Sequence, residues 1–281
     1  MINVSVYLTQ SLVNSELVLK DKNVVVIDTL RATSTMITAL ASGAKEIVPA
    51  ESATVAARIA KGSANSLLCG ERNGKIIEGF DLGNSPFEYT PEKVKGKSLV
   101  FCTTNGTVSI KKAKHSKSCV LGGFINFTKV VEYLSNLKED FIILCSGKLN
   151  HFCTEDVVTA GLILSEVITL GTFLGNKNNY SIGDSEYVSI KLGKLLSAKN
   201  GKPDYDRILD MQKKSEHGKY LMSIGFGSDL EFCSKIDSHP YLPVFRSGVF
   251  KLKESFDSEA SDKSKMRRIN ISNKTKDTES R

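Results

Sequence analysis

The sequence contains no apolar run that approaches the roughly 18 residues needed to cross a bilayer. Its N-terminal segment also lacks the basic stretch followed by an apolar stretch that marks a secretory signal. We therefore expect a cytoplasmic protein that does not bind membranes. Hydrophobic residues make up 41% of the 281 residues and charged residues 25%, which excludes disorder over the whole chain.

The sequence also lacks a CxxC pair, and none of its six cysteines combines with the four histidines at the spacing of a zinc finger. Cys69, Cys102 and Cys145 each end a hydrophobic run, and Cys119 lies within one. We expect these cysteines to be buried, reduced thiols that pack as small apolar side chains.

Positive charge is in modest excess, with 38 Lys and Arg against 31 Asp and Glu. Residues 251–281 hold nine basic and six acidic residues, so this segment carries +3 of the formal net charge of +7. The remaining charge is too small to predict a nucleic-acid interface. We expect the basic tail, residues 256–281, to be disordered because it has few apolar residues.

Short apolar runs alternate with helix-like stretches through the first half of the chain. The strongest runs are continuous, which is typical of strands covered on both faces. This alternation predicts an α/β layered domain with a largely parallel sheet. Strands are expected at residues 24–27, 46–48, 66–69, 99–102, 119–121 and 141–145, and helices at 34–42, 53–61, 108–113 and 128–137.

The second half of the chain is mostly helix-like. Residues 1–255 are expected to form one domain, and a division into two α/β lobes near residue 145 (1–145 and 146–255) is the alternative. The expected elements are helices at residues 154–170, 187–197 and 205–213 and near residue 228, and a last strand at 244–252.

Polar residues cluster directly after several of the expected strands. In an open α/β sheet, ligands bind beyond the carboxyl ends of the strands. Carboxylates, hydroxyls, amides and an arginine at these ends suit an anion held with a metal ion. The clusters are residues 28–34, 103–107 and 122–126, and residues 146–147 together with 155–156; the loops 70–74 and 79–86 are similarly rich in glycines, acids and amides.

Each cluster also has a purely structural interpretation. Asp28 could cap a turn or the next helix, and Arg31 could belong to a surface ion pair. The Asn-Gly pair at 105–106 is a hairpin signal that would join residues 99–104 to 107–110. Helical spacing in the following lysine-rich sequence favours a strand, a loop and a helix instead, with the glycine allowing close approach of an oxyanion.

The common phosphatase signatures are absent. A CxxxxxR loop would need arginine where Val108 and His151 stand, and a DxD motif would need aspartate where Leu30 stands. Neither an RHG motif nor a GxxxxGK[ST] loop occurs. Because no histidine lies in a paired metal-binding pattern, we expect oxygen ligands and hence Mg²⁺.

Six motifs stand in order within residues 3–250: VVVIDTLRATSTMITAL (24–40), CGERNGKIIEGFDLGNSPFEY (69–89), TTNGT (103–107), FIN (124–126), CSGKLNHFCTEDVVTAG (145–161) and HGKYLMSIGFGSDLEFCSKID (217–237). Together they resemble the 2-phosphosulfolactate phosphatase family. The resemblance implies a three-layer α/β/α fold with a mixed sheet. It also implies Mg²⁺-dependent hydrolysis of 2-phospho-3-sulfolactate to 3-sulfolactate and phosphate, a step of coenzyme M biosynthesis in archaea.

The resemblance also implies roles by position. In-line attack by water is the expected mechanism, with an aspartyl-phosphate on Asp28 as the alternative. Residues 146–153 depart from the family pattern, which could alter substrate choice. The candidates for binding Mg²⁺ are the acidic positions Asp28, Glu71, Asp81 and Asp156, and of these Asp28 and Asp156 are favoured for activating water. Two arginines, Arg31 and Arg72, suit contact with phosphate or sulfonate. The expected anion site consists of Thr103, Thr104, Asn105, Gly106, Thr107 and Asn126.

Two other functions remain open on the sequence alone. One is a phosphatase of another phosphorylated hydroxy acid or sulfonate, which a substrate panel would distinguish. The other is an anion-binding α/β protein without catalysis, which metal-dependent turnover of any phosphate ester would exclude. Enzymes of this size are often symmetric, so we expect a homodimer that binds a small anionic substrate.

Overall fold

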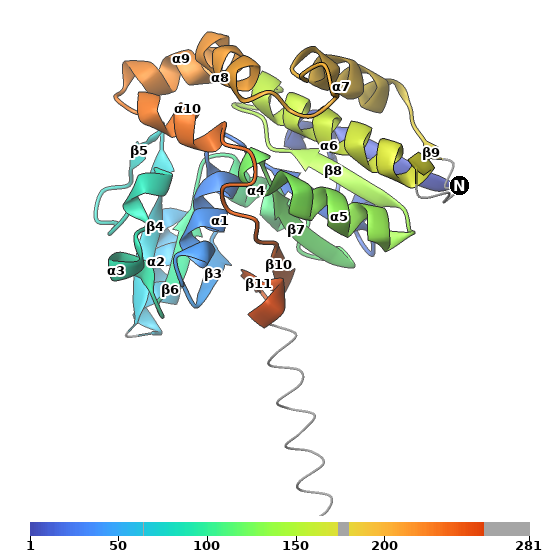
Figure 1. Cartoon of the computed structure of the whole chain (residues 1–281). Coiled ribbons are helices and arrows are strands. Elements are labelled where there is room, and N and C mark those ends of the chain that lie inside the picture. Colours follow the sequence, from blue (N-terminus) through green and yellow to red (C-terminus); the bar gives the residue numbers. More distant parts are fainter. Residues whose placement is uncertain (64, 174–179, 256–281) are drawn as a thin grey trace, which may run out of the picture.

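The strands of the chain form one β-sheet, and helices flank it (Figure 1). The computed structural model describes residues 1–63, 65–173 and 180–255. The strands are β1 (Ile2–Tyr7), β2 (Asn23–Ile27), β3 (Glu46–Pro49), β4 (Ser66–Arg72), β5 (Lys75–Ile76), β6 (Ser98–Cys102), β7 (Ser118–Gly122), β8 (Phe141–Cys145), β9 (Tyr180–Ser181), β10 (Pro243–Arg246) and β11 (Val249–Leu252). Their order across the eleven-stranded sheet is β5-β4-β6-β3-β11-β10-β7-β2-β8-β1-β9.

The helices lie between these strands along the chain. They are α1 (Ala32–Ala41), α2 (Ala53–Lys61), α3 (Pro91–Val94), α4 (Gly106–Lys112), α5 (Phe127–Leu137), α6 (Thr154–Phe173), α7 (Asp184–Leu195), α8 (Tyr205–Lys214), α9 (Glu216–Ser223) and α10 (Gly227–Cys233). None of the helices in the described part of the chain is long and apolar enough to span a membrane.

Strand direction divides the sheet into two parallel blocks. Strands β9, β1, β8, β2 and β7 form one block, and β3, β6 and β4 form the other. The hairpin β10–β11 lies between them and pairs antiparallel with β7 on one side and with β3 on the other. Direction therefore reverses between the blocks, and a flat sheet would point their carboxyl ends toward opposite edges. Sheets twist, and Figure 1 shows the two blocks running in different directions.

Apolar side chains cover both faces of β2, an interior strand of the sheet. Val25 and Ile27 pack in one cluster with residues of α5 and α6, whereas Val24 and Val26 pack in another with residues of α1 and α4. Successive side chains of a strand point to opposite faces, so a continuous apolar run is what a strand buried on both sides requires. The expected three-layer α/β/α arrangement with a mixed, largely parallel sheet is confirmed.

All six strands expected in the first half are present, and residues 103–107 lead into a helix rather than a hairpin. Thr103 and Thr107 cap this helix, α4, reciprocally. The Thr107 N–H donates to Thr103 Oγ1, and the Thr103 N–H donates to Thr107 Oγ1, each at 3.1 Å. The prediction misses β1, whose side chains alternate between buried and exposed, and the two-residue strands β5 and β9.

The single strand predicted at 244–252 is wrong, because this segment is the hairpin β10–β11. Ser247 and Gly248 at its turn have φ values of 52° and 88°. Positive φ at both central residues is typical of a tight turn that matches the twist of a hairpin. The division into lobes near residue 145 stays a prediction, although the one sheet takes strands from both parts. The tail, 256–281, lies outside the described residues.

Phe250 anchors the hairpin to the neighbouring block. It is fully buried, lies opposite Ile47 of β3, and its ring centroid is 5.1 Å from that of Phe245. Replacement by alanine leaves a cavity, so we expect Phe250→Ala to lower the free energy of unfolding by about 3–5 kcal/mol in urea denaturation. The control is Phe87→Ala, since this side chain is 53% exposed. Equal losses in the two variants would contradict the prediction.

Candidate active site

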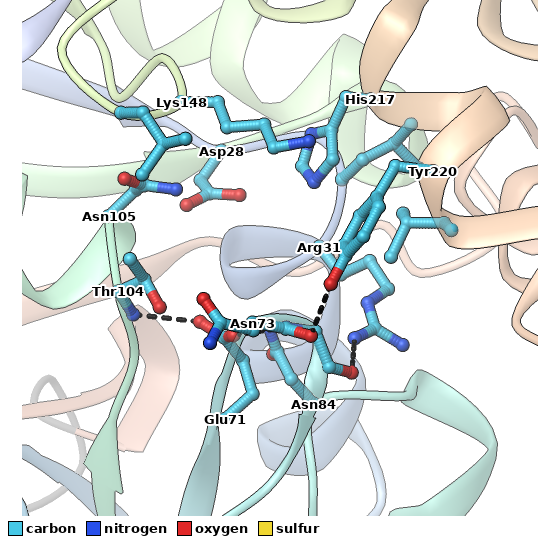
Figure 2. A pocket seen from close by; sticks show the side chains of 14 residues that line it. Asp28, Arg31, Glu71, Asn73, Asn84, Thr104, Asn105, Lys148, His217 and Tyr220 are labelled. Carbon is cyan, nitrogen blue, oxygen red and sulfur yellow. Dashed lines mark hydrogen bonds between the residues drawn. The ribbon is translucent and has the colours of Figure 1, made fainter. Parts of the chain in front are cut away.

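One cavity of about 230 Å³ gathers side chains from the ends of four strands (Figure 2). Strands β2 and β8 belong to one parallel block and β4 and β6 to the other, so the cavity lies where the two blocks meet. Helix α9 covers one side of it. The polar residues that line the cavity are Asp28, Arg31, Glu71, Asn73, Asn84, Thr104, Asn105, Lys148, His217 and Tyr220.

Asp28 lies between the first residues of two helices, one from each block. Its Oδ1 accepts a hydrogen bond from the Ala32 N–H of α1 at 3.1 Å. A Cβ placed on Gly106, the first residue of α4, would lie 2.9 Å from Asp28 Oδ2, so only glycine permits this approach. Burial raises the pKa of Asp28 to about 6, and the nearby His217 partly opposes this effect.

Glu71 connects two loops of the second block through hydrogen bonds. Its Oε1 accepts a hydrogen bond from the Thr104 N–H and its Oε2 accepts one from the Gly74 N–H, both at 2.7 Å. The carboxylate is therefore held in one orientation at the cavity wall, next to the TTNGT loop that follows β6.

Two buried oxygens of the cavity-lining residues have no protein partner, namely Asn84 Oδ1 and Thr104 Oγ1. A buried polar atom without a partner is unfavourable unless an ion, water or ligand binds it. Carboxylate, amide and hydroxyl oxygens are the ligands that Mg²⁺ prefers, and this ion usually takes one or two carboxylates and keeps several waters. The donor set of Asp28, Glu71 and these two atoms therefore fits Mg²⁺.

Arg31 faces the cavity but is also bound within the protein. Its Nη1 donates to Asp229 Oδ2 at 2.6 Å, and its Nη2 donates to the Gly74 carbonyl at 2.7 Å. The guanidinium also lies 4.2 Å from the ring centroid of Phe226. These contacts neutralise much of the charge of Arg31. Bidentate binding of phosphate by the guanidinium would compete with its hydrogen bonds to Asp229 and Gly74.

Sequence reasoning missed several cavity residues, above all His217, Lys148 and Tyr220. His217 Nδ1 lies 2.9 Å from Glu155 Oε1, and the Lys148 ammonium lies 4.3 Å from the ring centroid of Tyr220. The i, i+3 spacing of the histidine and the tyrosine on α9 was the available signal, since such residues share a helix face.

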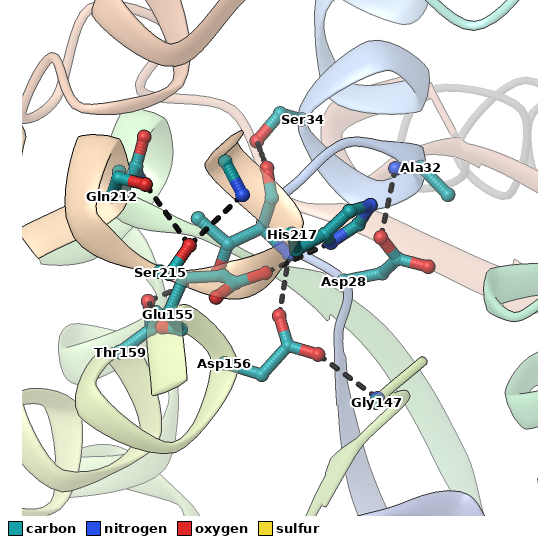
Figure 3. Close-up of polar contacts among 12 residues, drawn as sticks. Asp28, Ala32, Ser34, Gly147, Glu155, Asp156, Thr159, Gln212, Ser215 and His217 are labelled. Carbon is teal, nitrogen blue, oxygen red and sulfur yellow. Dashed lines mark hydrogen bonds and ion pairs between the residues drawn. The ribbon is translucent and has the colours of Figure 1, made fainter. Parts of the chain in front are cut away.

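Asp156 is buried and is not among the residues that line the cavity; Figure 3 shows its contacts. Its Oδ1 accepts from the Thr29 N–H at 2.8 Å, and its Oδ2 accepts from the Gly147 N–H at 3.0 Å. It thus joins the loop after β2 to the loop after β8. Burial, together with the charge of Asp28, raises its pKa well above the ordinary value.

The other residues predicted for the site are absent from the lining of this cavity in the described part of the chain, and each has a local partner. Asp81 accepts from the backbone of Leu68, Arg72 donates to Cys102 Sγ, Thr103 and Thr107 cap each other, and the fully buried Asn126 bonds to the backbone of Gly123, Leu121 and Tyr241.

The fold and the site define an α/β protein in which carboxylate, amide and cationic side chains line a cavity between two parallel blocks. A family model described as 2-phosphosulpholactate phosphatase matches residues 7–248. The chain is 38% identical to a probable 2-phosphosulfolactate phosphatase of Caldanaerobacter subterraneus, over 85% of this chain and 93% of the relative. Relatives with the same description from Thermotoga maritima and Caldicellulosiruptor saccharolyticus are 39% and 41% identical, each over 83% of this chain and over 93% and 92% of their own lengths. This chain belongs to the 2-phosphosulfolactate phosphatase family.

The approach of Asp28 to Gly106 can be tested with one methyl group. In Gly106→Ala the new Cβ would lie 2.5 Å from Ala32 Cβ and 2.9 Å from Asp28 Oδ2, so the carboxylate must move. We expect a melting temperature several degrees lower, from a loss of about 1–3 kcal/mol. The control is Gly227→Ala, which also alters the first residue of a helix but meets only Met222 Cγ, at 3.6 Å. Equal effects of the two substitutions would show that the contact is not tight.

The raised pKa of Asp28 makes stability depend on pH. Between its unfolded value near 3.8 and its folded value of about 6, the folded chain binds more protons, so stability falls as pH rises through this window. In EDTA at about pH 8, we expect Asp28→Asn to be more stable than the unaltered protein by up to about 3 kcal/mol, a gain that disappears toward about pH 4. Thermal unfolding at both pH values measures this, with the exposed Asp81→Asn as control. A gain independent of pH would contradict the prediction.

Proposed function

We propose that this chain is a Mg²⁺-dependent phosphatase that hydrolyses 2-phospho-3-sulfolactate to 3-sulfolactate and inorganic phosphate. Membership of the family supports the substrate, and the cavity supports the chemistry. The observation that carries the proposal is the meeting of Asp28 and Glu71 with Lys148 and Arg31 in a single cavity at the ends of the strands. In the archaeal pathway to coenzyme M, the family's reaction removes the phosphate group and leaves the sulfonate.

The electrostatics of the cavity support the requirement for a metal ion. Two carboxylates line it, Asp156 and Glu155 lie close to Asp28, and Asp229 neutralises much of the charge on Arg31. The substrate itself carries phosphate, carboxylate and sulfonate groups. Negative charges repel one another strongly when they are buried together, so the substrate needs a divalent cation beside the acidic groups.

The oxygen donors around Glu71 are suited to hold the ion. Glu71, Asn84 Oδ1 and Thr104 Oγ1 would bind it, and bound Mg²⁺ would supply positive charge to the phosphoryl oxygens. Asp28 orients the attacking water and accepts its proton, a role suited to a carboxyl group with a pKa of about 6. Lys148 attracts the anionic groups of the substrate.

The departing alkoxide needs a proton, and His217 is placed to supply it. Its Nδ1 lies 2.9 Å from Glu155 Oε1, and this contact fixes the orientation of the ring. Asp156 acts as a positioning residue, because its bonds to Thr29 and Gly147 hold the two loops that carry Asp28 and Lys148.

The decisive experiment measures phosphate release from racemic 2-phosphosulfolactate, with and without Mg²⁺, beside phospholactate and an aryl phosphate. We expect Mg²⁺-dependent release that strongly favours the sulfonate. Asp28→Asn should reduce kcat by about 100-fold or more, because proton abstraction is lost. The control Asp81→Asn should retain near-normal turnover, since its carboxylate is exposed and bonds the Leu68 backbone.

The other outcomes each identify a different function. Hydrolysis of phospholactate or the aryl phosphate without hydrolysis of the sulfonate would keep a phosphatase and reject the assigned substrate. No release from any ester would favour an anion-binding protein without catalysis. Near-normal activity of Asp28→Asn would remove Asp28 from the proton transfer.

A further inference from the structure

A second group of potential metal ligands lies beside the cavity and shares one residue with it. Cys153, Glu155 and His217 each place a ligand atom within 4.8 Å of the others. Cys153 directly precedes α6 and accepts the Val157 N–H on its carbonyl, Glu155 lies in the first turn of α6, and His217 lies in the first turn of α9. The ligands therefore come from two helix starts about 60 residues apart, which the fold brings together.

The carboxylate of Glu155 is incompletely satisfied. Its side chain is 1% exposed, Oε1 lies 2.9 Å from His217 Nδ1, and the buried Oε2 has no protein partner. An unpartnered carboxylate oxygen at this depth is unfavourable, because this atom has lost its water without gaining a hydrogen-bond partner in the protein. A cation bound between the three side chains would satisfy it.

The chemistry of the three ligands selects the cation. Thiolate, imidazole and carboxylate are the ligands of zinc sites, whereas Mg²⁺ takes oxygen ligands and avoids sulfur. Burial and the nearby carboxylates raise the pKa of the Cys153 thiol, and a zinc ion bound to the sulfur would displace its proton. The group thus differs in kind from the all-oxygen set of Glu71, Asn84 and Thr104 that is proposed above to bind Mg²⁺.

The surroundings leave room for a fourth ligand. The same three side chains line a second cavity of about 360 Å³, together with Lys148, His151 and Ser215. Three protein ligands with one position open to water or to a small molecule is the arrangement of zinc sites that exchange ligands, in contrast to closed structural sites with four.

We propose that Cys153, Glu155 and His217 bind Zn²⁺ in a site separate from the Mg²⁺ position, with the fourth position open to this second cavity. On binding, the S–H bond of Cys153 breaks, its proton passes to solvent, and a sulfur–zinc bond forms without change of oxidation state. Zinc on His217 would withdraw the proton donor assigned above, so zinc occupancy opposes turnover. The binding itself does not rest on the proposed phosphatase function.

Cobalt substitution tests the site without any measurement of activity. The full chain, purified without metal and held in excess Mg²⁺, is titrated with Co²⁺ and then with Zn²⁺. We expect one equivalent of Co²⁺ to give a thiolate-to-cobalt charge-transfer band in the near ultraviolet and the intense visible bands of a tetrahedral complex. Zn²⁺ should abolish both. Co²⁺ in an all-oxygen site lacks the thiolate band, so the two positions are distinguished.

Matched cysteine variants decide which thiol is involved. Cys153→Ala should lose the charge-transfer band and weaken Zn²⁺ binding about 100-fold or more, since even indirect supports of a metal ligand contribute about 10–100-fold. Cys119→Ala, which removes a buried thiol within β7, should keep the band and the affinity. His217→Ala, at a side chain that is 15% exposed, provides a second ligand variant. Circular dichroism confirms that each variant is folded.

Three results would overturn the proposal. These are the absence of a thiolate band in the unaltered protein, its persistence in Cys153→Ala, and Zn²⁺ affinity that neither Cys153→Ala nor His217→Ala changes. A failure of phosphatase activity would leave all three readouts intact, so the two proposals fail independently.

Discussion

The contact between the Asp28 carboxylate and the backbone of Gly106 is the constraint around which the cavity is built. Asp28 follows β2 of one parallel block, and Gly106 opens the helix that follows β6 of the other. The hairpin β10–β11 joins the two blocks, and their strands run in opposite directions. The carboxyl ends of the two blocks meet only because the sheet is twisted. The hairpin comes from the last described part of the chain, so the site is complete only when residues 243–252 have joined the sheet.

Negative charge concentrates at this junction, and backbone N–H groups hold most of it in place. Asp28, Glu71 and Asp156 each accept hydrogen bonds from backbone amides, yet burial still raises the pKa of Asp28 and of Asp156. The folded chain therefore maintains carboxylates in a place that disfavours their charge. In the proposed function, a bound cation would relieve this penalty and would also allow a multiply charged anion to enter, so the electrostatic cost of the fold and the proposed chemistry would have one origin.

Most of the sheet could be predicted because burial on both faces leaves a local mark, as in the VVVI run of β2. The cavity residues next to strand ends, such as Asp28, Glu71 and Thr104, could be predicted for the same reason, because parallel strands present their carboxyl ends to ligands. The contact between His217 and Glu155 could not be predicted, since the two residues are 62 positions apart and no local spacing indicates that they meet. The cysteine, glutamate and histidine group beside it is likewise a product of helix packing, which is why no zinc spacing is visible along the chain.

The chain's own apolar pattern is sufficient to specify an α/β sheet, since each strand's burial depends on side chains within a few residues of one another. It is not sufficient to choose among polar residues of the same type. The cavity is lined by Asp28, Arg31 and Asn105. Residues of the same types, Asp81, Arg72 and Asn126, instead form hydrogen bonds with backbone or thiol groups and do not line the cavity. The difference arises from the twist between the two blocks and the position of α9, and both depend on contacts between segments far apart in the chain.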